Sequence, residues 1–429
     1  MKKMLCVALN FLMIATLAGC GGQEKDQEVF TPTLDKKTAC NIVVAGHYSN
    51  FQALEKEFDR FNVYYPNVIF KYTKVNDYEN KLATVLEGND KPNIFFSEPK
   101  MVDNDTYAAI ASHMEDLSDP KLGINFDCIR PNLINHAKDN KTYMVPIFSR
   151  TYGALVNKNL FRQEGLELPT TWSELLNVCN QFKAKGYENP IMGYTKDKKP
   201  VSGLMNAIAY PYFISELANN PQALKLANNL DAQAGEYMRK ALNAVDQLAK
   251  NGCFNVEACD AISDNYEKVL LRFFEGDVPM MVCNGDTVSG AKSRESKSEA
   301  FKNEPFKYSF YPIPVTEEGG FFIDSPSVEF SVNKDCDNLE MTNEFMRFLI
   351  RTNELDEMAS QKGLITTSKT VPFEPNYAAF NEVPIERTIS PEVIGVKDTL
   401  ATQIRIASYK VGKGELTVDE AIAQYGTLE

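Results

Sequence analysis

The sequence predicts an α/β protein of two lobes, joined by strands that cross from one lobe to the other. Its 429 residues are enough for two hydrophobic cores. In the first third, short apolar runs alternate with amphipathic segments of helical period, which is typical of a parallel sheet covered by helices. Farther on, the strand-like segment Tyr143–Ile147 is interrupted at Phe148–Tyr152 and resumes at Ala154–Asn157. An interruption of this kind is what we expect where a chain passes between two lobes.

The first third supplies three predicted strands, Asn41–Ala45, Val68–Tyr72 and Ile94–Phe96. The first is followed by a helix with Phe51, Leu54, Phe58 and Phe61 on one face, and Ser49 with Gln52 has the spacing of a capping box. The second strand is followed by a helix at Tyr78–Leu86. Ligands bind outside the carboxyl ends of parallel strands. The rule selects five candidate binding residues that follow the first and third strands: Tyr48, Ser49, Asn50, Ser97 and Glu98.

Past the interrupted strand, Thr171 and Glu174 form a second predicted capping box, which begins a helix that buries Leu175, Cys179 and Phe182. A third box begins a short helix at Thr417. We also expect a second crossing between the lobes near Asp324–Glu329. The remaining predicted elements are helices at Val201–Leu217, Gly235–Lys250, Tyr266–Phe274 and Asp337–Ile350 and strands at Val278–Cys283 and Tyr308–Pro314.

The N-terminus has the layout of an export signal, with Lys2 and Lys3 followed by the apolar run Met4–Leu17. This run is too short and wrongly flanked for a membrane span. The following Leu17-Ala18-Gly19-Cys20 resembles a bacterial lipobox, which implies removal of residues 1–19 and lipidation of Cys20. An ordinary signal peptide with a chance cysteine is the alternative. The polar stretch to residue 38 then predicts a flexible tether.

The composition argues against several classes of partner and reaction. The formal charge is −13 with no block of Lys or Arg, so nucleic acid and anionic lipid surfaces are poor partners. The three histidines are scattered without metal-ligand spacing, and we expect no metal and no cofactor. The tetrapeptide Ser289–Lys292 matches S-x-x-K and Ser263–Asn265 matches S-D-N, but their order is reversed and K-T-G is absent. We therefore expect no enzyme. A glycosidase with paired carboxylates needs no motif, so this alternative stays open.

Seven of the nine cysteines follow Cys20. Cys253 and Cys259 are close enough in sequence for a small disulfide loop in an oxidising compartment. Two buried thiols would fit equally well.

Three stretches together resemble a known family: Val145-Pro146, Ala154–Phe161 and Pro169–Leu175. Their order is similar to that in extracellular solute-binding proteins of ABC importers, in the sugar-binding (maltose-binding-like, family 1) branch. The helix-turn-strand at Tyr266–Cys283 and the ending T-V-D-E-A extend the resemblance from about Asn41 to Tyr425. It implies a type II periplasmic-binding-protein-like fold with a multi-strand hinge and a ligand cleft between the lobes. The implied division is lobe I at 39–150 plus 328–372 and lobe II at 151–327 plus 373–429.

The resemblance also implies a function. It describes a monomeric, extracytoplasmic lipoprotein, held to the cell membrane by lipid on Cys20, that captures a sugar or related polar solute and delivers it to an ABC permease. Three alternatives remain: a glycan-processing enzyme, a ligand sensor for a membrane receptor, and a binder of a cationic solute such as a polyamine.

Sugar sites combine aromatic faces with planar polar side chains. By position in the family, Arg150 is a ligand contact in the crossing, and an inter-lobe salt bridge is the equal alternative. Family members commonly place a tryptophan where this chain has Asp286, so we expect a polar, acidic site. Core packing is the favoured role of Tyr210. The further candidate binding residues are Tyr152, Tyr210, Asn284, Asp286 and Asp324.

Overall fold

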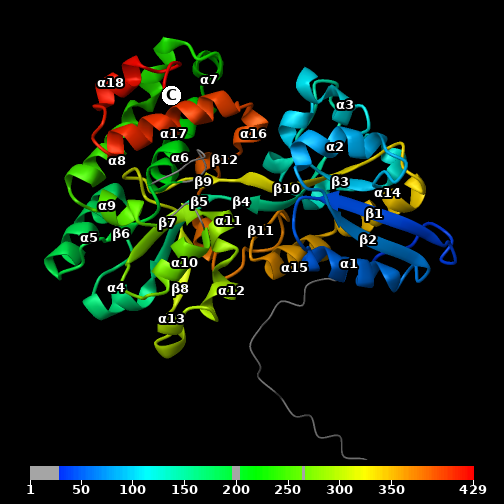
Figure 1. The fold of residues 1–429 in the computed structure, drawn as a ribbon, viewed down its shortest axis with the longest axis horizontal. Helices are drawn as coiled ribbons and strands as arrows, with labels where there is room; N and C mark the ends of the chain where they lie inside the picture. The colour runs from blue at the N-terminus through cyan, green and yellow to red at the C-terminus, as the bar shows by residue number, and fades with distance from the viewer. Residues whose placement is uncertain (1–28, 196–202, 263–265) are drawn as a thin grey trace, which may run out of the picture.

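A computed structural model describes residues 29–195, 203–262 and 266–429 as two α/β lobes that lie side by side (Figure 1). The predicted signal, Cys20 and the motif Ser263–Asn265 lie outside the described residues. Within the described part, no helix is both long and apolar enough to cross a membrane.

Lobe I is built on a six-stranded sheet in the order β11-β4-β10-β3-β1-β2. The strands β1, β2 and β3 are parallel, as the alternation of strands and helices predicts, whereas β10 runs antiparallel to β3 and β4. The strands are β1 (Cys40–Gly46), β2 (Val68–Lys74), β3 (Ile94–Ser97), β4 (Val145–Arg150), β10 (Ser325–Val332) and β11 (Ile365–Thr366).

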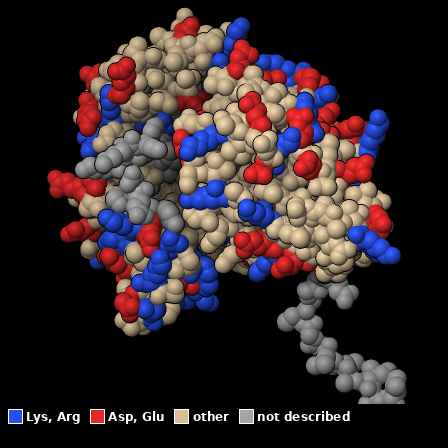
Figure 2. Space-filling model, turned by 45° about the vertical axis from the view of Figure 1, so that its right-hand side comes forward, with Lys and Arg blue, Asp and Glu red and all other residues tan. Residues whose placement is uncertain are grey.

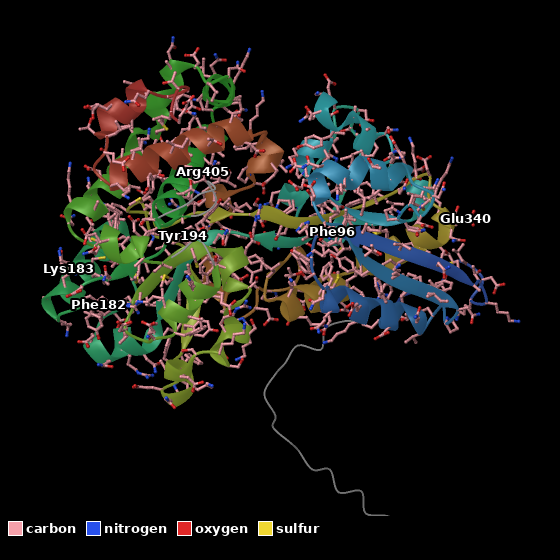
Figure 3. The ribbon with its side chains drawn as sticks, viewed as in Figure 1. Phe96, Phe182, Lys183, Tyr194, Glu340 and Arg405 are labelled. Atoms are coloured by element: carbon pink, nitrogen blue, oxygen red, sulfur yellow. The ribbon has the colours of Figure 1, made fainter. Side chains whose placement is uncertain are left out.

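Helices cover both faces of this sheet. On one face, α1 (Gln52–Asn62), α14 (Leu339–Leu349) and α15 (Thr352–Lys362) enclose the main apolar cluster of the lobe. On the other face, α2 (Tyr78–Glu87) and α3 (Ala108–Ala111) enclose a smaller cluster. Figure 3 labels Phe96, which belongs to the larger cluster, near the middle of the molecule.

The start of α1 corrects one prediction. Phe51 occupies the N-cap position, without a side-chain cap, so Ser49 and Gln52 form no capping box. The Phe51 ring is only 1% exposed, and its burial places the start of the helix after Phe51. The Ser49 hydroxyl instead accepts a hydrogen bond from Lys74 Nζ at 3.3 Å.

Lobe II contains a four-stranded sheet in the order β6-β7-β5-β8, in which β5 pairs antiparallel with β7 and β8. The two-stranded sheet β12-β9 lies beside the hinge. The strands are β5 (Tyr152–Asn157), β6 (Ile191–Met192), β7 (Met280–Asn284), β8 (Tyr308–Tyr311), β9 (Phe322–Ile323) and β12 (Thr388–Ile389).

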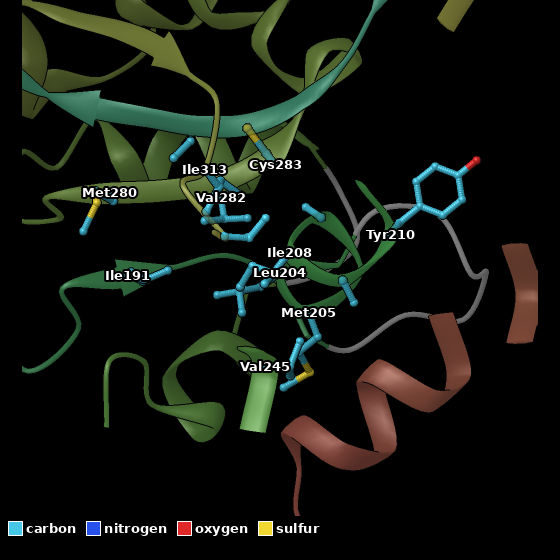
Figure 4. Close-up of a cluster of buried hydrophobic side chains, with 14 of the residues drawn as sticks. Ile191, Leu204, Met205, Ile208, Tyr210, Val245, Met280, Val282, Cys283 and Ile313 are labelled. Carbon is cyan, nitrogen blue, oxygen red and sulfur yellow. The ribbon is translucent and has the colours of Figure 1, made fainter. Parts of the chain in front are cut away.

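The core of lobe II surrounds α6, which is buried along most of its length and packs on α8 and α17 (Figure 4). Chain segments before α6 and at the C-terminus thus share one core. Figure 3 labels two of its aromatic side chains, Phe182 and Tyr194. The helices are α4 (Lys158–Glu164), α5 (Trp172–Ala184), α6 (Leu204–Ala218), α7 (Pro221–Asn228), α8 (Arg239–Lys250), α9 (Val256–Asp260), α10 (Tyr266–Phe273), α11 (Gly285–Val288), α12 (Ala291–Glu295), α13 (Glu299–Asn303), α16 (Pro391–Ile394), α17 (Asp398–Gly412) and α18 (Val418–Ala423). The other two predicted capping boxes, at Thr171 and Thr417, are confirmed.

The first crossing between the lobes is shorter than predicted. Only Thr151 separates β4 in lobe I from β5 in lobe II, because Phe148 to Arg150 pair with β10 and β11. The second crossing is Asp324, between β9 and β10. A third connection runs from β11 to β12. Pro146 lies inside the sheet rather than at its edge, opposite an irregularity in register at Val328–Glu329.

The chain is held to lobe I from Phe30 onward, so the predicted tether to residue 38 is too long. The Phe30 side chain is 3% exposed, and its ring lies 5.1 Å from that of Tyr64 and 4.5 Å from the Arg347 guanidinium. The backbone N–H of Thr33 donates to Glu344 at 2.8 Å.

Candidate functional site

A polar pocket of about 590 Å³ lies between the lobes, beside the hinge. The surface in Figure 2 is hollowed between the lobes, and acidic and basic side chains are interspersed on this face. Lobe I contributes His47, Tyr48, Asn50, Phe51, Gln52, Ala53, Arg150, Ser327, Gln361, Lys362 and Leu364, and lobe II contributes Asp286, Ser289, Gly290, Ser293 and Arg294.

The fold explains how these residues meet. His47 and Tyr48 follow the carboxyl end of β1, Arg150 ends β4, and Asp286 follows β7. Lys362 ends α15 and is followed by Gly363, whose φ of +69° is left-handed and closes the helix. A Cβ on Gly363 would lie 3.1 Å from the Ser289 carbonyl oxygen, so the end of α15 lies directly against lobe II.

A second hollow of about 500 Å³ lies on the outer side of lobe I, along α1 and α15. Its lining belongs to one lobe only, so movement of the lobes would not enclose a ligand there. The inter-lobe pocket is therefore the better candidate.

An ion pair across the lobes occupies the centre of the pocket. Arg150 Nη1 lies 2.8 Å from Asp286 Oδ2, and the Ser327 hydroxyl donates to Asp286 Oδ1 at 3.1 Å. The side chains of Arg150 and Asp286 remain 42% and 41% exposed. The salt bridge considered as an alternative for Arg150 is thus present, and a ligand can still reach both side chains.

Lys362 lies over the Tyr48 ring, with its Nζ 4.3 Å from the ring centroid. Burial is the main cause that lowers the pKa of Lys362 and that of His47. Burial and the Asp286 charge raise the pKa of the Tyr48 hydroxyl. One face of the pocket's best-placed aromatic ring is therefore covered by a cation.

Four of the predicted binding residues line the pocket, namely Tyr48, Asn50, Arg150 and Asp286. Tyr152 and Tyr210 do not; their rings contact each other at 5.4 Å in lobe II, and Tyr210 is 9% exposed. In Figure 4 the Tyr210 ring points away from the cluster around Leu204 and Ile208. Ser49 is also outside the lining.

Asp324 is a buried structural group, contrary to the prediction of a ligand contact. Its carboxylate is fully buried and accepts hydrogen bonds from Arg130 Nε and Nη2 at 2.8 and 2.9 Å. Asn132 donates to it at 2.8 Å, and the Ser149 hydroxyl also donates to it. These partners come from two separate segments, the one that contains Arg130 and Asn132 and strand β4, so Asp324 holds the second crossing in place.

Three further candidates have local partners outside the pocket. The Asn284 side chain caps α11 by accepting from the Thr287 N–H at 3.0 Å. Ser97 is buried and accepts from the Ser331 hydroxyl at 2.8 Å. Glu98 pairs with Lys100 at 3.2 Å.

These positions correct the expectation of an acidic site. The described part of the pocket lining contains three cationic side chains, Arg150, Arg294 and Lys362, and one carboxylate, Asp286. Arg294 lies 3.6 Å from Glu267. Sequence reasoning did not select Lys362 or Ser327. The Lys362-Gly363 pair is a local signal for the end of a helix. The contact between Lys362 and Tyr48 depends instead on how two segments that are distant in sequence pack together.

The described cysteines are free thiols, so the Cys253–Cys259 disulfide is not formed in this structure. The Cys253 side chain instead hydrogen-bonds with Cys179. Across the described ranges, no group of three His, Cys, Asp or Glu side chains lies close enough to hold a metal ion.

Residues 52–384 match the family described as bacterial extracellular solute-binding protein. The melibiose/raffinose/stachyose-binding protein MelE of Bacillus subtilis (strain 168) is 21% identical over 393 residues, which cover 87% of this chain and 84% of MelE. The multiple sugar-binding protein of Streptococcus mutans serotype c is 24% identical over 197 residues, 43% of this chain and 42% of that protein.

Two solved structures share the two-lobe fold. RafE in complex with raffinose is 18% identical, with a TM-score of 0.66 over 91% of this chain and 100% of RafE. The sugar-binding protein MalE from Xanthomonas citri is 16% identical, with a TM-score of 0.69 over 90% of this chain and 95% of MalE. Together with the family match over most of the chain, the fold identifies this protein as a member of the bacterial extracellular solute-binding protein family.

Proposed function

We propose that this protein captures a saccharide between its lobes and delivers it to an ABC permease. The observation that carries the proposal is a polar pocket beside the hinge, lined from both lobes. A ligand can favour the closed arrangement only if it binds that arrangement more tightly than the open one. Contacts to Arg150 in lobe I and Asp286 in lobe II provide such a difference. The names of the relatives MelE and multiple sugar-binding protein support a saccharide as the solute.

The pocket gives less support to the alternative functions. A polyamine needs several unengaged carboxylates, whereas Asp286 is the one carboxylate in the lining that the structure describes, and it is bonded to Arg150. A glycosidase needs two carboxyl groups about 5–10 Å apart across the scissile bond. The described lining offers one. Binding without catalysis therefore fits better than turnover.

The proposal includes the predicted lipid anchor. Lipid on Cys20 would hold a monomer outside the cytoplasmic membrane, close to its permease. The chain is held to lobe I from Phe30, so the anchor would lie ten residues before the first buried contact with that lobe. A sensor that presents its closed form to a receptor would use the same pocket and anchor, and it remains the second candidate.

Isothermal titration calorimetry of the chain from residue 20, with Cys20→Ser, tests the capture step. The panel contains melibiose, raffinose, neutral and acidic disaccharides, and spermidine. We expect saturable binding of a saccharide, weakened at least tenfold by Arg150→Ala. Arg239→Ala is the matched control, because Arg239 has a similar exposed fraction, 40%, in a surface ion pair outside the pocket. Binding of spermidine with no response to any saccharide would contradict the proposal.

A further inference from the structure

The feature that the proposed function does not explain is Lys362. Its ammonium lies 4.3 Å from the centroid of the Tyr48 ring and 6.0 Å from that of Phe51, inside the inter-lobe pocket. In the described part of the chain, no carboxylate lies within ion-pair distance of it. The charge that acts on it most favourably is that of Asp286, which is itself bonded to Arg150. Burial lowers the pKa of Lys362, since part of its hydration is lost without a counter-ion.

The charges of the pocket do not balance. Among the described residues that line it, Asp286 is the only carboxylate, and Arg150 and Ser327 already donate to it. This ion pair is neutral as a unit, and it leaves Lys362 as an uncompensated cation. Burial lowers the pKa of His47, so the imidazole adds no charge at neutral pH. The described lining of the pocket therefore carries a net positive charge, although the whole chain carries −13.

The Tyr48 and Phe51 rings of the described lining are partly or wholly covered. Neutral sugars commonly place an apolar C–H face on an aromatic ring. Here Lys362 covers one face of Tyr48, and Phe51 is only 1% exposed. The single tryptophan, Trp172, is at the start of α5, outside the pocket. The groups that remain available to a ligand are the cationic donors Arg150 and Lys362, beside amides and hydroxyls that can donate or accept.

We propose that the saccharide bound in this pocket is acidic, and that Lys362 and Arg150 hold its carboxylate. This inference rests on the proposed function and names the class of solute. Arg150 uses Nη1 for Asp286, and its planar fork has further N–H donors that suit a second carboxylate. The Lys362 ammonium supplies the charge that the pocket itself does not neutralise. A uronic acid carries this carboxylate at a position where the neutral sugar has a hydroxymethyl group.

The test compares matched pairs of ligands by calorimetry on the same Cys20→Ser chain. The pairs are digalacturonate with galactobiose, cellobiouronate with cellobiose, and dimannuronate with mannobiose, and galactose 6-phosphate provides a phosphate. We expect at least one uronate to bind ten times more tightly than its neutral partner at low salt, and this preference to shrink in 0.5 M NaCl. In Lys362→Gln the preference should fall to less than threefold, and in Lys362→Arg it should persist.

Lys81→Gln is the matched control, since it removes one exposed lysine from α2 of the same lobe, outside the pocket. It should retain the full preference. Equal or tighter binding of the neutral sugars would overturn the inference and leave the proposed function standing. Tight binding of the phosphate alone would overturn the carboxylate assignment. An unchanged preference in Lys362→Gln would exclude Lys362 as its source. Failure of every saccharide would overturn the proposed function as well.

Discussion

Substitution of Asp324, at the second crossing, tests whether this buried carboxylate stabilises the fold. Its carboxylate is fully buried and accepts two hydrogen bonds from Arg130, one from Asn132 and one from Ser149. Arg130 is itself only 12% exposed. Replacing Asp324 with Asn keeps the volume but removes the charge, and it leaves the guanidinium buried without its counter-ion. Breaking a buried pair in this way costs about 3–5 kcal/mol.

For Asp324→Asn we expect a loss of stability at the lower end of this range of about 3–5 kcal/mol. Arg130 Nη1 also donates to the carbonyl oxygens of Thr366 and Ser368, and these bonds survive the substitution. We therefore expect the free energy of unfolding to fall by about 3 kcal/mol. Glu98→Gln is the control: Glu98 is 53% exposed and pairs with Lys100, so its loss should cost less than about 1 kcal/mol.

Urea unfolding measures both variants. Circular dichroism follows the helices of both lobes, and the fluorescence of the single tryptophan, Trp172, reports on lobe II alone. Coincident transitions would justify a two-state free energy. A free energy of unfolding of Asp324→Asn that lies within about 1 kcal/mol of that of the parent chain would refute this prediction. A simultaneous tenfold loss of saccharide affinity would restore Asp324 to the binding site that the sequence predicted.

Three other substitutions test separate features. Thr171→Ala removes a capping box in which the Thr171 hydroxyl accepts from the Glu174 N–H at 3.2 Å, and it should lower the free energy of unfolding by about 1 kcal/mol; an unchanged urea midpoint would contradict this. Burial raises the pKa of Glu57 to about 8, so this carboxyl stabilises the folded state at acidic pH and loses that contribution as pH rises from about 4.5 to about 8. Glu57→Gln should therefore gain stability relative to the parent as pH rises over this window, and a constant difference would argue against it. Phe30→Ala should detach residues 29–38 and speed tryptic cleavage at Lys36 and Lys37 without changing ligand affinity; equal cleavage rates would show that Phe30 does not hold this segment.

Local patterns determined much of the fold. The capping boxes at Thr171 and Thr417 were predictable because both partners lie three residues apart, within one turn of helix. The parallel strands of lobe I were predictable because each is a short apolar run next to an amphipathic helix. The capping box at Ser49 failed because burial of the Phe51 ring, a tertiary effect, determines where α1 begins.

Some of the residues that the sequence selected line the pocket. Residues that follow parallel strands, such as Tyr48 and Asn50, could be selected because the carboxyl ends of those strands meet at one edge. The same rule selected Ser97 and Glu98, which bond to neighbours outside the pocket. Strand position gives the edge of the sheet but not the direction or the partner of each side chain.

By itself, the sequence determined the α/β class, the passage between two lobes and the family resemblance, because these depend on periodicity and on motifs within a few dozen residues. Only the tertiary structure decided which charges meet. Arg150 and Asp286 are 136 residues apart, and Arg130 and Asp324 are 194 apart. Lys362, at the end of α15, meets Tyr48 although the two lie in distant parts of the sequence. The electrostatic energy of a charged group does not depend on separation along the sequence. It depends on the dielectric and on the counter-ions that packing places around the group. The charge of the described pocket lining, and with it the class of solute that we propose, therefore follows from packing.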